Sequence, residues 1–297
     1  MFIINHRKIF LTISALFVLL SGLAIAVFGL NLGIDFTGGS ILEVEYKDGR
    51  PEINQIRQAL NESDFAETSI QPAGSSNAIF RLRSINEGEK DTLLEVVAVS
   101  GQTVTEERFS SIGPTLSSEL ARRGVIALVL VSVLIILFIA LAFKGVSKPV
   151  SSWAYGVVAV VALLHDVIIP TGVFAVLGYL YGVEIDTLFL TAILTILGLS
   201  VNDTIVVFDR IRENLKNKIS NDFAITVGKS LEQTFMRSIN TSLTVILVLV
   251  ALYIFGGTTT QDFALVLLIG AVVGTYSSLF LASPLLVMWH KIKNKED

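Results

Sequence analysis

The sequence predicts a polytopic α-helical membrane protein that carries one small α+β domain. Of the 297 residues, 52% are hydrophobic and 16% are charged, and the mean hydropathy is +0.70. Soluble domains instead average about 25% charged residues. The charges are also unevenly distributed, because residues 31–123 hold 15 of the 26 acidic and 9 of the 22 basic side chains. This split predicts one polar module set among membrane spans.

Six apolar segments are long enough to cross a bilayer, which requires about 20 residues in helical form. They are residues 9–30, 124–143, 150–178, 187–208, 238–256 and 263–289. The first segment resembles a cleaved signal sequence, since Ala24 and Ala26 form a small-residue cleavage pattern. However, its 22 uncharged residues exceed the usual apolar length of about 7 to 15. We expect it to remain as an anchor.

The basic residues of the connections indicate the orientation, because short cytoplasmic loops are enriched in lysine and arginine. The connections around residues 184–186 and 256–262 contain no lysine or arginine. All the basic residues of the short connections and of the two termini lie at the other ends of the spans. These residues are Arg7, Lys8, Lys144, Lys148, Arg210, Arg212, Lys216, Lys218, Lys229, Arg237, Lys291, Lys293 and Lys295. Both termini are therefore expected in the cytoplasm. The predicted divisions are the amino terminus with its first helix (1–30), an extracytoplasmic domain (31–123), helices two to six (124–289) and a cytoplasmic tail (290–297).

Residues 31–123 read as a βαββαβ domain. Residues 40–46 alternate between apolar and acidic side chains, which is typical of a half-buried strand. A helix is expected from Pro51, strands at 68–71 and 78–83, a helix at 89–99 and a strand near 102–109. This order suits the ferredoxin-like split βαβ arrangement, with both helices on one face of an antiparallel sheet. The domain has no histidine, cysteine or glycine-rich phosphate loop, so an interaction or moving domain is favoured over a catalytic one.

Two aspartates lie inside predicted spans, where each costs about 2.5 to 3.5 kcal/mol on insertion scales. Asp203 lies five residues before the predicted end of the fourth span, next to Asn202 and Thr204. Arg237 is expected to open the fifth helix at the same membrane face, followed by Asn240 on a polar stripe. The pair could form a proton site, because separating a carboxylate from a guanidinium changes its proton affinity. The alternative is that Asp203 packs between helices and Arg237 anchors the span at the surface.

Asp166 lies deep in the third span beside His165. Adjacent residues of a helix point in different directions, so the two side chains are expected to face different neighbours. A satisfied hydrogen bond between helices is as good an explanation for Asp166 as a functional role. In the sixth span, Gly270, Gly274, Ser278 and Ala282 form a small-residue stripe suited to close helix packing.

Several classes of function are disfavoured by composition. The chain has no cysteine, which excludes disulfides, thiolate metal sites and cysteine nucleophiles. No metal site, bound cofactor or nucleotide site is expected, and the net charge of -4 with no dense basic patch gives no reason to invoke nucleic acid. Asp166 and Asp203 could be the dyad of an intramembrane aspartyl protease, but the expected arginine partner would keep Asp203 ionised, and the dyad requires one shared proton.

Six strings together resemble the SecF branch of the SecD/SecF protein-export family, in the resistance-nodulation-division superfamily. They are GIDFTGG (33–39), IGPT (112–115), LHD (164–166), SVNDT (200–204), FDRIREN (208–214) and RSINT (237–241). The resemblance covers nearly the whole chain and implies a non-enzymatic subunit of a bacterial cytoplasmic membrane. It places the relay aspartate of the fourth span on Asp203 and the relay arginine of the fifth on Arg237. It also makes Asp35, Gly38 and Gly39 a packing or hinge motif.

The resemblance further implies that the chain helps to move unfolded polypeptides outward at a late stage of export, with the proton gradient as energy source. The implied partners are SecD, which would hold the second relay aspartate, the SecYEG translocon, the translocating polypeptide, YajC and, indirectly, SecA. The alternative from the same superfamily is half of a proton-driven exporter of lipids or small molecules. Such exporters carry much larger outer domains than the roughly 90 residues present here.

Overall fold

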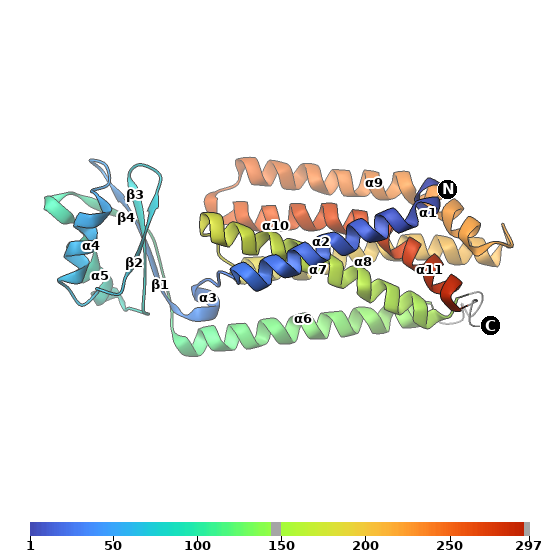
Figure 1. The fold of residues 1–297 in the computed structure, drawn as a ribbon. Coiled ribbons are helices and arrows are strands. Elements are labelled where there is room, and N and C mark those ends of the chain that lie inside the picture. Colours follow the sequence, from blue (N-terminus) through green and yellow to red (C-terminus); the bar gives the residue numbers. More distant parts are fainter. Residues whose placement is uncertain (144–149, 294–297) are drawn as a thin grey trace. The chain divides into compact units, whose positions relative to one another are not determined.

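The computed structural model of the protein describes residues 1–143 and 150–293, which form two compact units (Figure 1). The helical unit combines Met1–Asn31 with the chain from Ile126 onward, and the small unit comprises Leu32–Val125. Lys144, Lys148 and Lys295, which helped to predict the orientation, lie outside the described residues, as do residues 294–297 of the predicted tail.

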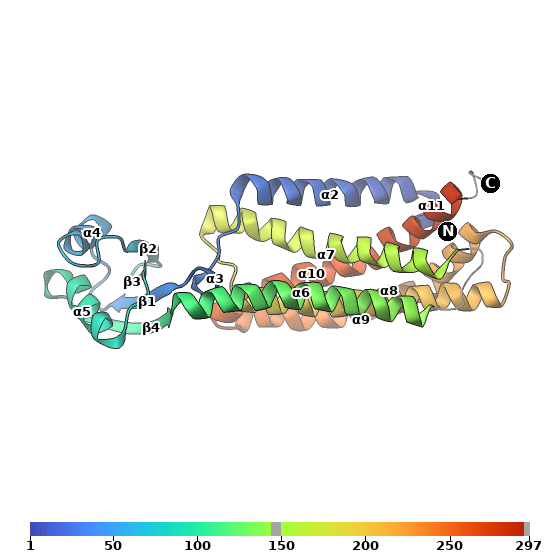
Figure 2. The same cartoon turned by 90° about the horizontal axis from the view of Figure 1, so that it is seen from below.

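Six helices of the described chain are long and apolar enough to cross a membrane, which confirms the predicted number. Five of them pack together in the helical unit (Figure 2), and the second along the sequence begins in the small unit and continues into the helical unit from Ile126. A short helix, α1 (Phe2–Asn5), precedes them. The six are α2 (Arg7–Phe28), α6 (Pro114–Ala142), α7 (Ser152–Tyr181), α8 (Thr187–Lys216), α9 (Phe223–Phe255) and a last helix that runs through α10 (Thr258–Tyr276), the π-helical turn η2 (Ser277–Ala282) and α11 (Ser283–Lys293).

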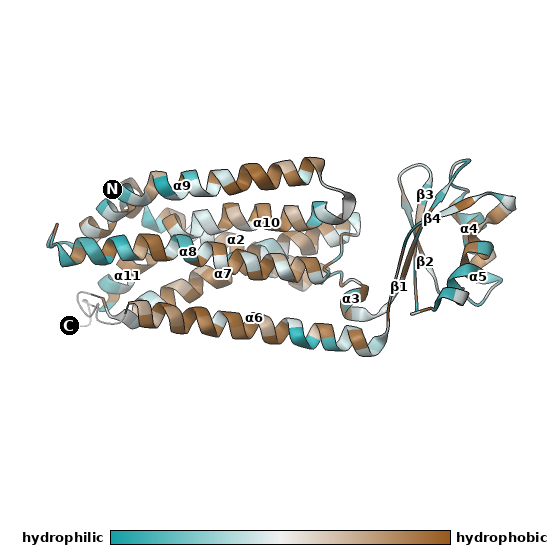
Figure 3. Ribbon diagram, turned by 180° about the vertical axis from the view of Figure 1, so that it is seen from behind, coloured by the Kyte–Doolittle hydropathy of each residue, from teal (hydrophilic) through white to brown (hydrophobic). Residues whose placement is uncertain are grey.

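Two of these helices extend well past the apolar runs, and their polar ends gather where α8 connects to α9 (Figure 3). Asp222 caps the start of α9 by accepting a hydrogen bond from the backbone N–H of Ala224 at 2.6 Å. Asn214 Nδ2 of α8 donates to Ser230 Oγ at 2.8 Å and also to the next turn of α9. Because these contacts extend the helix toward its amino end, the prediction that Arg237 opens the fifth helix is wrong: it lies well inside α9.

Small residues let α10 approach α8 closely. A Cβ added to Gly270 would collide with the side chain of Ile196, and one added to Gly274 would lie 3.1 Å from Ser200 Cβ. The first half of the predicted small-residue stripe therefore packs against α8.

The small unit has the predicted βαββαβ order. Its elements are β1 (Gly39–Tyr46), α4 (Ile53–Asn61), β2 (Ser69–Ala73), β3 (Asn77–Leu82), α5 (Glu87–Val97) and β4 (Val104–Ile112). A short 3-10 turn, η1 (Val99–Gly101), precedes β4, and a short helix, α3 (Ile34–Thr37), precedes β1. The sheet is antiparallel, in the order β2-β3-β1-β4, and α4 and α5 cover one face of it (Figure 1).

The core of the small unit follows the alternation of β1. Leu42, Val44 and Tyr46 are fully buried and pack against residues of both helices, such as Ile56 and Leu93. This arrangement confirms the fold class that the sequence predicts, six helices with an α+β domain between the first and second.

The two consecutive glycines before β1 occupy positions that other residues rarely adopt. Gly38 has φ +76° and ψ 165°, and Gly39 has φ +125°. A Cβ on Gly38 would lie 3.1 Å from Ser117 Oγ, and one on Gly39 would lie 2.7 Å from the carbonyl oxygen of Leu82. Both glycines therefore allow the chain to turn tightly into the sheet, with Asp35 just before them in α3.

Candidate functional site

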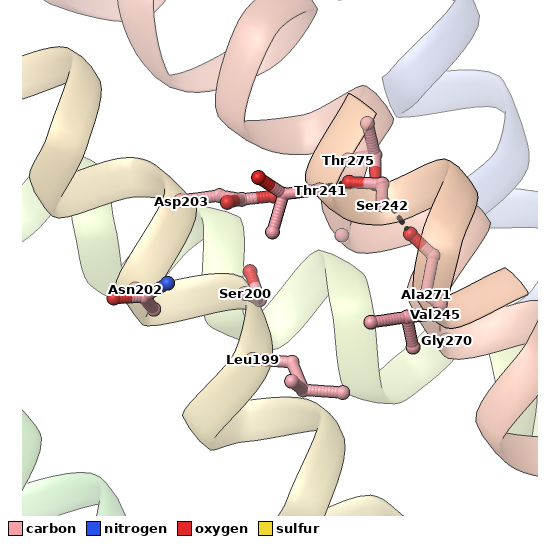
Figure 4. Close-up of a pocket in the computed structure, with 11 residues that line it drawn as sticks. Leu199, Ser200, Asn202, Asp203, Thr241, Ser242, Val245, Gly270, Ala271 and Thr275 are labelled. Carbon is pink, nitrogen blue, oxygen red and sulfur yellow. Dashed lines mark hydrogen bonds between the residues drawn. The ribbon is translucent and has the colours of Figure 1, made fainter. Parts of the chain in front are cut away.

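The carboxylate of Asp203 lies where α8 faces α9 and α10. Its Oδ2 accepts a hydrogen bond from Ser242 Oγ of α9 at 3.3 Å, and Ser242 Oγ accepts one from Thr275 Oγ1 of α10 at 2.6 Å. The three residues line one cavity of about 40 Å³ (Figure 4), which has room for a water molecule. A half-buried ionisable group is thus connected through hydroxyls to two neighbouring helices.

Arg237 lies near this cavity but does not touch Asp203. Among the ion pairs of the described residues, none joins the two. Arg237 is exposed and lines a separate hollow of about 350 Å³, together with Asp209, Glu213 and Gln233. It is five residues from Ser242 along α9, or about 7.5 Å. Its positive charge still acts on the Asp203 carboxylate. The partner that contacts Asp203 is therefore Ser242.

The other polar residues predicted around Asp203 are dispersed. Asn202 lines the same cavity, but its side chain points away from Asp203 and Ser242 (Figure 4). Thr204 is buried, with 2% of its surface exposed. Asn240 is exposed on α9. The cavity thus draws its hydroxyl groups from α9, from α10 and from Ser200 of α8, rather than from the residues directly beside Asp203 in the sequence.

A second polar cluster surrounds Asp166 on α7. Asp166 is fully buried, and its Oδ2 accepts hydrogen bonds from Ser200 Oγ of α8 and, at 2.7 Å, from Ser277 Oγ of η2. Its Oδ1 lies 2.9 Å from Nδ1 of His165. The expectation that His165 and Asp166 face different neighbours is therefore wrong, because the imidazole lies within hydrogen-bond distance of the adjacent carboxyl. The predicted hydrogen bond between helices is present.

Sequence reasoning missed Ser242, Thr275 and Ser277. Each is a single hydroxyl residue in an apolar helix, where the side chain usually bonds to its own backbone. Thr275 and Ser277 also lie within bonding distance of the carbonyls of Ala271 and Gly274. Nothing in the sequence distinguishes these hydroxyls from others that serve helix packing alone.

The chemistry available at the site is reversible protonation. A carboxylate in contact with hydroxyl groups can gain and lose a proton, and in a membrane such a residue marks an ion or proton path by default. The described residues contain no group of three histidine or acidic side chains arranged to hold a metal ion.

Comparisons with known proteins agree along the whole chain. The model of the SecD/SecF C-terminal family of protein export membrane proteins matches residues 92–292, and the SecD/SecF GG motif matches residues 23–49, which include Gly38 and Gly39. The protein translocase subunit SecF of Thermobaculum terrenum is 43% identical, over 97% of this chain and 93% of the relative. The SecF subunit of Anaerolinea thermophila is 38% identical over the same shares.

Longer proteins contain the same region. The crystal structure of SecDF from Thermus thermophilus, a translocon-associated membrane protein, superposes with a TM-score of 0.83 at 32% identity, covering 97% of this chain and 38% of that chain. The SecDF subunit of Bacillus subtilis is 34% identical over 99% of this chain and 38% of its own length. This chain therefore corresponds to less than two fifths of either SecDF protein. It belongs to the SecD/SecF family of protein export membrane proteins, as a SecF-type subunit of the protein translocase.

Proposed function

We propose that this chain works with a SecD partner to drive the late stage of polypeptide export by the proton motive force. The observation that carries the proposal is the carboxylate of Asp203 inside the helical unit, which is hydrogen-bonded to Ser242. Arg237 lies five residues before Ser242 on α9, and its charge acts on that carboxylate. The named relatives are protein translocase subunits, so we favour polypeptides over lipids or small molecules as substrate.

A facing partner is supported by the polar groups that α8 and α9 leave exposed. Asn202, Asn240 and Thr241 are exposed on these helices, and Asn202 and Thr241 line the cavity. Polar side chains that face lipid are unfavourable, and burial against another helical unit removes that cost. SecDF proteins hold both parts in one chain, and we assign the facing role to SecD. We propose that the polypeptide comes from the SecYEG translocon, that YajC is a further partner, and that SecA takes part indirectly.

The proposed mechanism couples protonation of Asp203 to movement of the helices. Protonation removes the negative charge that Arg237 attracts and weakens the hydrogen bond from Ser242, so the contact between α8 and α9 changes. Each proton that moves inward across the membrane supplies about 2.3 kcal/mol per 100 mV, which is enough to bias an equilibrium between two states about 50-fold. With both termini in the cytoplasm, the small unit faces outward and moves with the bound polypeptide.

The proposal is tested in inverted vesicles that contain this chain and SecD, by measuring export of a secreted reporter with and without a proton gradient. Asp203→Asn keeps the size of the side chain and its acceptor oxygen but cannot carry the proton. We expect it to lose the stimulation by the gradient while the complex still assembles. The matched control is Asp262→Asn, the same change at an exposed residue near the start of α10, which should keep the stimulation. Equal stimulation in the wild type and Asp203→Asn would show that Asp203 only packs between helices.

A further inference from the structure

The buried pair of His165 and Asp166 is built to hold a proton. The two residues are 3% and 0% exposed, and an isolated charge at such a depth is too costly to persist. Since His165 Nδ1 lies 2.9 Å from Asp166 Oδ1, one proton can reside either on the carboxyl or on the imidazole. His165 Nε2 is also buried and has no hydrogen-bond partner within the described chain, so the ring retains a free site that a proton can occupy.

No fixed cation neutralises the pair within the part of the chain that the structure describes. The elements packed against α7 are α2, α8, α10, η2 and α11. Two of their titratable residues lie within one helical turn of a hydroxyl that bonds to Asp166. Asp203 is three residues after Ser200, and Tyr276 directly precedes Ser277. The others are Arg7, Lys8, Asp209, Arg210, Arg212, Glu213, Lys216, Asp262, His290, Lys291 and Lys293. The charge on the pair is therefore set by its own protons.

Ser200 connects this pair to Asp203. The two residues are three positions apart on α8 and therefore share a face of the helix. Ser200 Oγ donates to Asp166, while the same residue lines the cavity of about 40 Å³ that Asp203 and Ser242 also line. One water in that cavity would complete a path of hydrogen bonds between the two carboxyl groups.

The pair also contacts the irregular part of the last helix. Ser277, which donates to Asp166, is the first residue of the π-helical turn between α10 and α11. The ring of Tyr276 stacks on His165, with 6.1 Å between centroids and an interplanar angle of 20°. Turns of this kind occur often at functional sites. A change in the charge of Asp166 would therefore alter a contact at the joint of this helix.

We propose that His165 and Asp166 form a second proton-binding site, which exchanges a proton with Asp203 through Ser200 and the shared cavity. The relay role of Asp203 rests on the proposed function above, but the protonation of Asp166 does not. The site gives this chain two linked carboxyl groups, one half-exposed on α8 and one enclosed among α7, α8 and η2.

The test is infrared difference spectroscopy of the full chain with SecD in lipid vesicles, as the pH is changed. We expect two carbonyl bands of protonated carboxyl groups within the helices, one lost in Asp203→Asn and the other in Asp166→Asn. Ser200→Ala should keep both bands but slow hydrogen–deuterium exchange of the Asp166 band about tenfold, the effect of one lost hydrogen bond in the path. Thr195→Val, which alters an exposed hydroxyl bonded within α8, should leave the bands and the exchange unchanged.

The outcomes separate the two proposals. If Asp166→Asn folds, as judged by its thermal unfolding, and removes no band at any pH, the second site is refuted, whatever Asp203→Asn does to export. If Asp166→Asn does not fold, the wild-type spectrum decides, because a single band that disappears in Asp203→Asn also refutes the site. An unchanged exchange rate in Ser200→Ala overturns the path between the carboxyl groups. If export is insensitive to Asp203→Asn while two bands still titrate, only the proposed function is refuted and the second site stands.

Discussion

Replacing Gly39 with alanine should loosen the sheet of the small unit at the start of β1, where the chain enters the sheet. The new Cβ would lie 2.7 Å from the backbone oxygen of Leu82, at a residue whose φ is +125°. The backbone conformation alone costs a residue other than glycine about 1 to 3 kcal/mol. Relieving the close contact moves β1 away from β3 at the pair of Ser40 and Leu82, which weakens a hydrogen bond worth about 1 kcal/mol. The expected loss of stability is about 2 to 4 kcal/mol.

Gly49 provides the matched control. Its φ is +86°, and nothing lies within 4 Å of an added Cβ, so Gly49→Ala carries only the conformational cost of about 1 to 2 kcal/mol. Hydrogen–deuterium exchange of the full chain reports the opening of each strand separately. Amides of β1 and β3 should exchange about 30-fold faster or more in Gly39→Ala, with the helices of the helical unit unaffected. Exchange no faster than in Gly49→Ala would refute the argument that the Leu82 carbonyl requires glycine.

Three further changes test other contacts. Ser242→Ala removes the hydrogen bond to Asp203 and should lower gradient-stimulated export about 2- to 10-fold, whereas Thr244→Val, whose hydroxyl bonds within α9, should not. Burial raises the pKa of Tyr46 from 10 to about 12. The neutral phenol therefore contributes its full stabilisation of the small unit below about pH 10, and this contribution is lost as the pH rises to about 12. Tyr46→Phe should remove that pH dependence and cost about 1 kcal/mol, the hydrogen bond to the Val97 carbonyl, as measured by amide exchange of the small unit at each pH. Asn86→Ala removes the cap of α5, where Asn86 and Glu89 bond to each other's backbone N–H at 3.0 Å. It should speed exchange in α5 about fivefold, for a loss of about 1 kcal/mol.

The fold could be predicted because its signals are local. The alternation of Leu42, Val44 and Tyr46 defines both the strand and its buried face, and each span is a run of apolar residues. The ends of α8 and α9 could not be predicted this way, because their polar turns are held by contacts between the two helices, such as that from Asn214 to Ser230.

The site was predictable only in part. Asp203 and Asp166 stand out because a carboxyl group in an apolar helix is costly. Their partners do not, since Ser242 and Ser277 are ordinary hydroxyl residues until the packing of α9 and η2 against α7 and α8 brings them to the carboxylates. The placement of Arg237 within α9, apart from Asp203, likewise depends on where that helix begins.

The hydrogen bond from Asn214 to Ser230 joins α8 and α9 close to the connection between them. Ser242 lies 12 residues beyond Ser230 and Phe255 lies 25 residues beyond it, or about 18 Å and 37 Å along the helix. If this contact held while the helices separated at Asp203, the separation at the far end of α9 would be about twice as large. A small change at the carboxylate would then have its largest effect at the opposite end of the bundle, where α9 turns into α10.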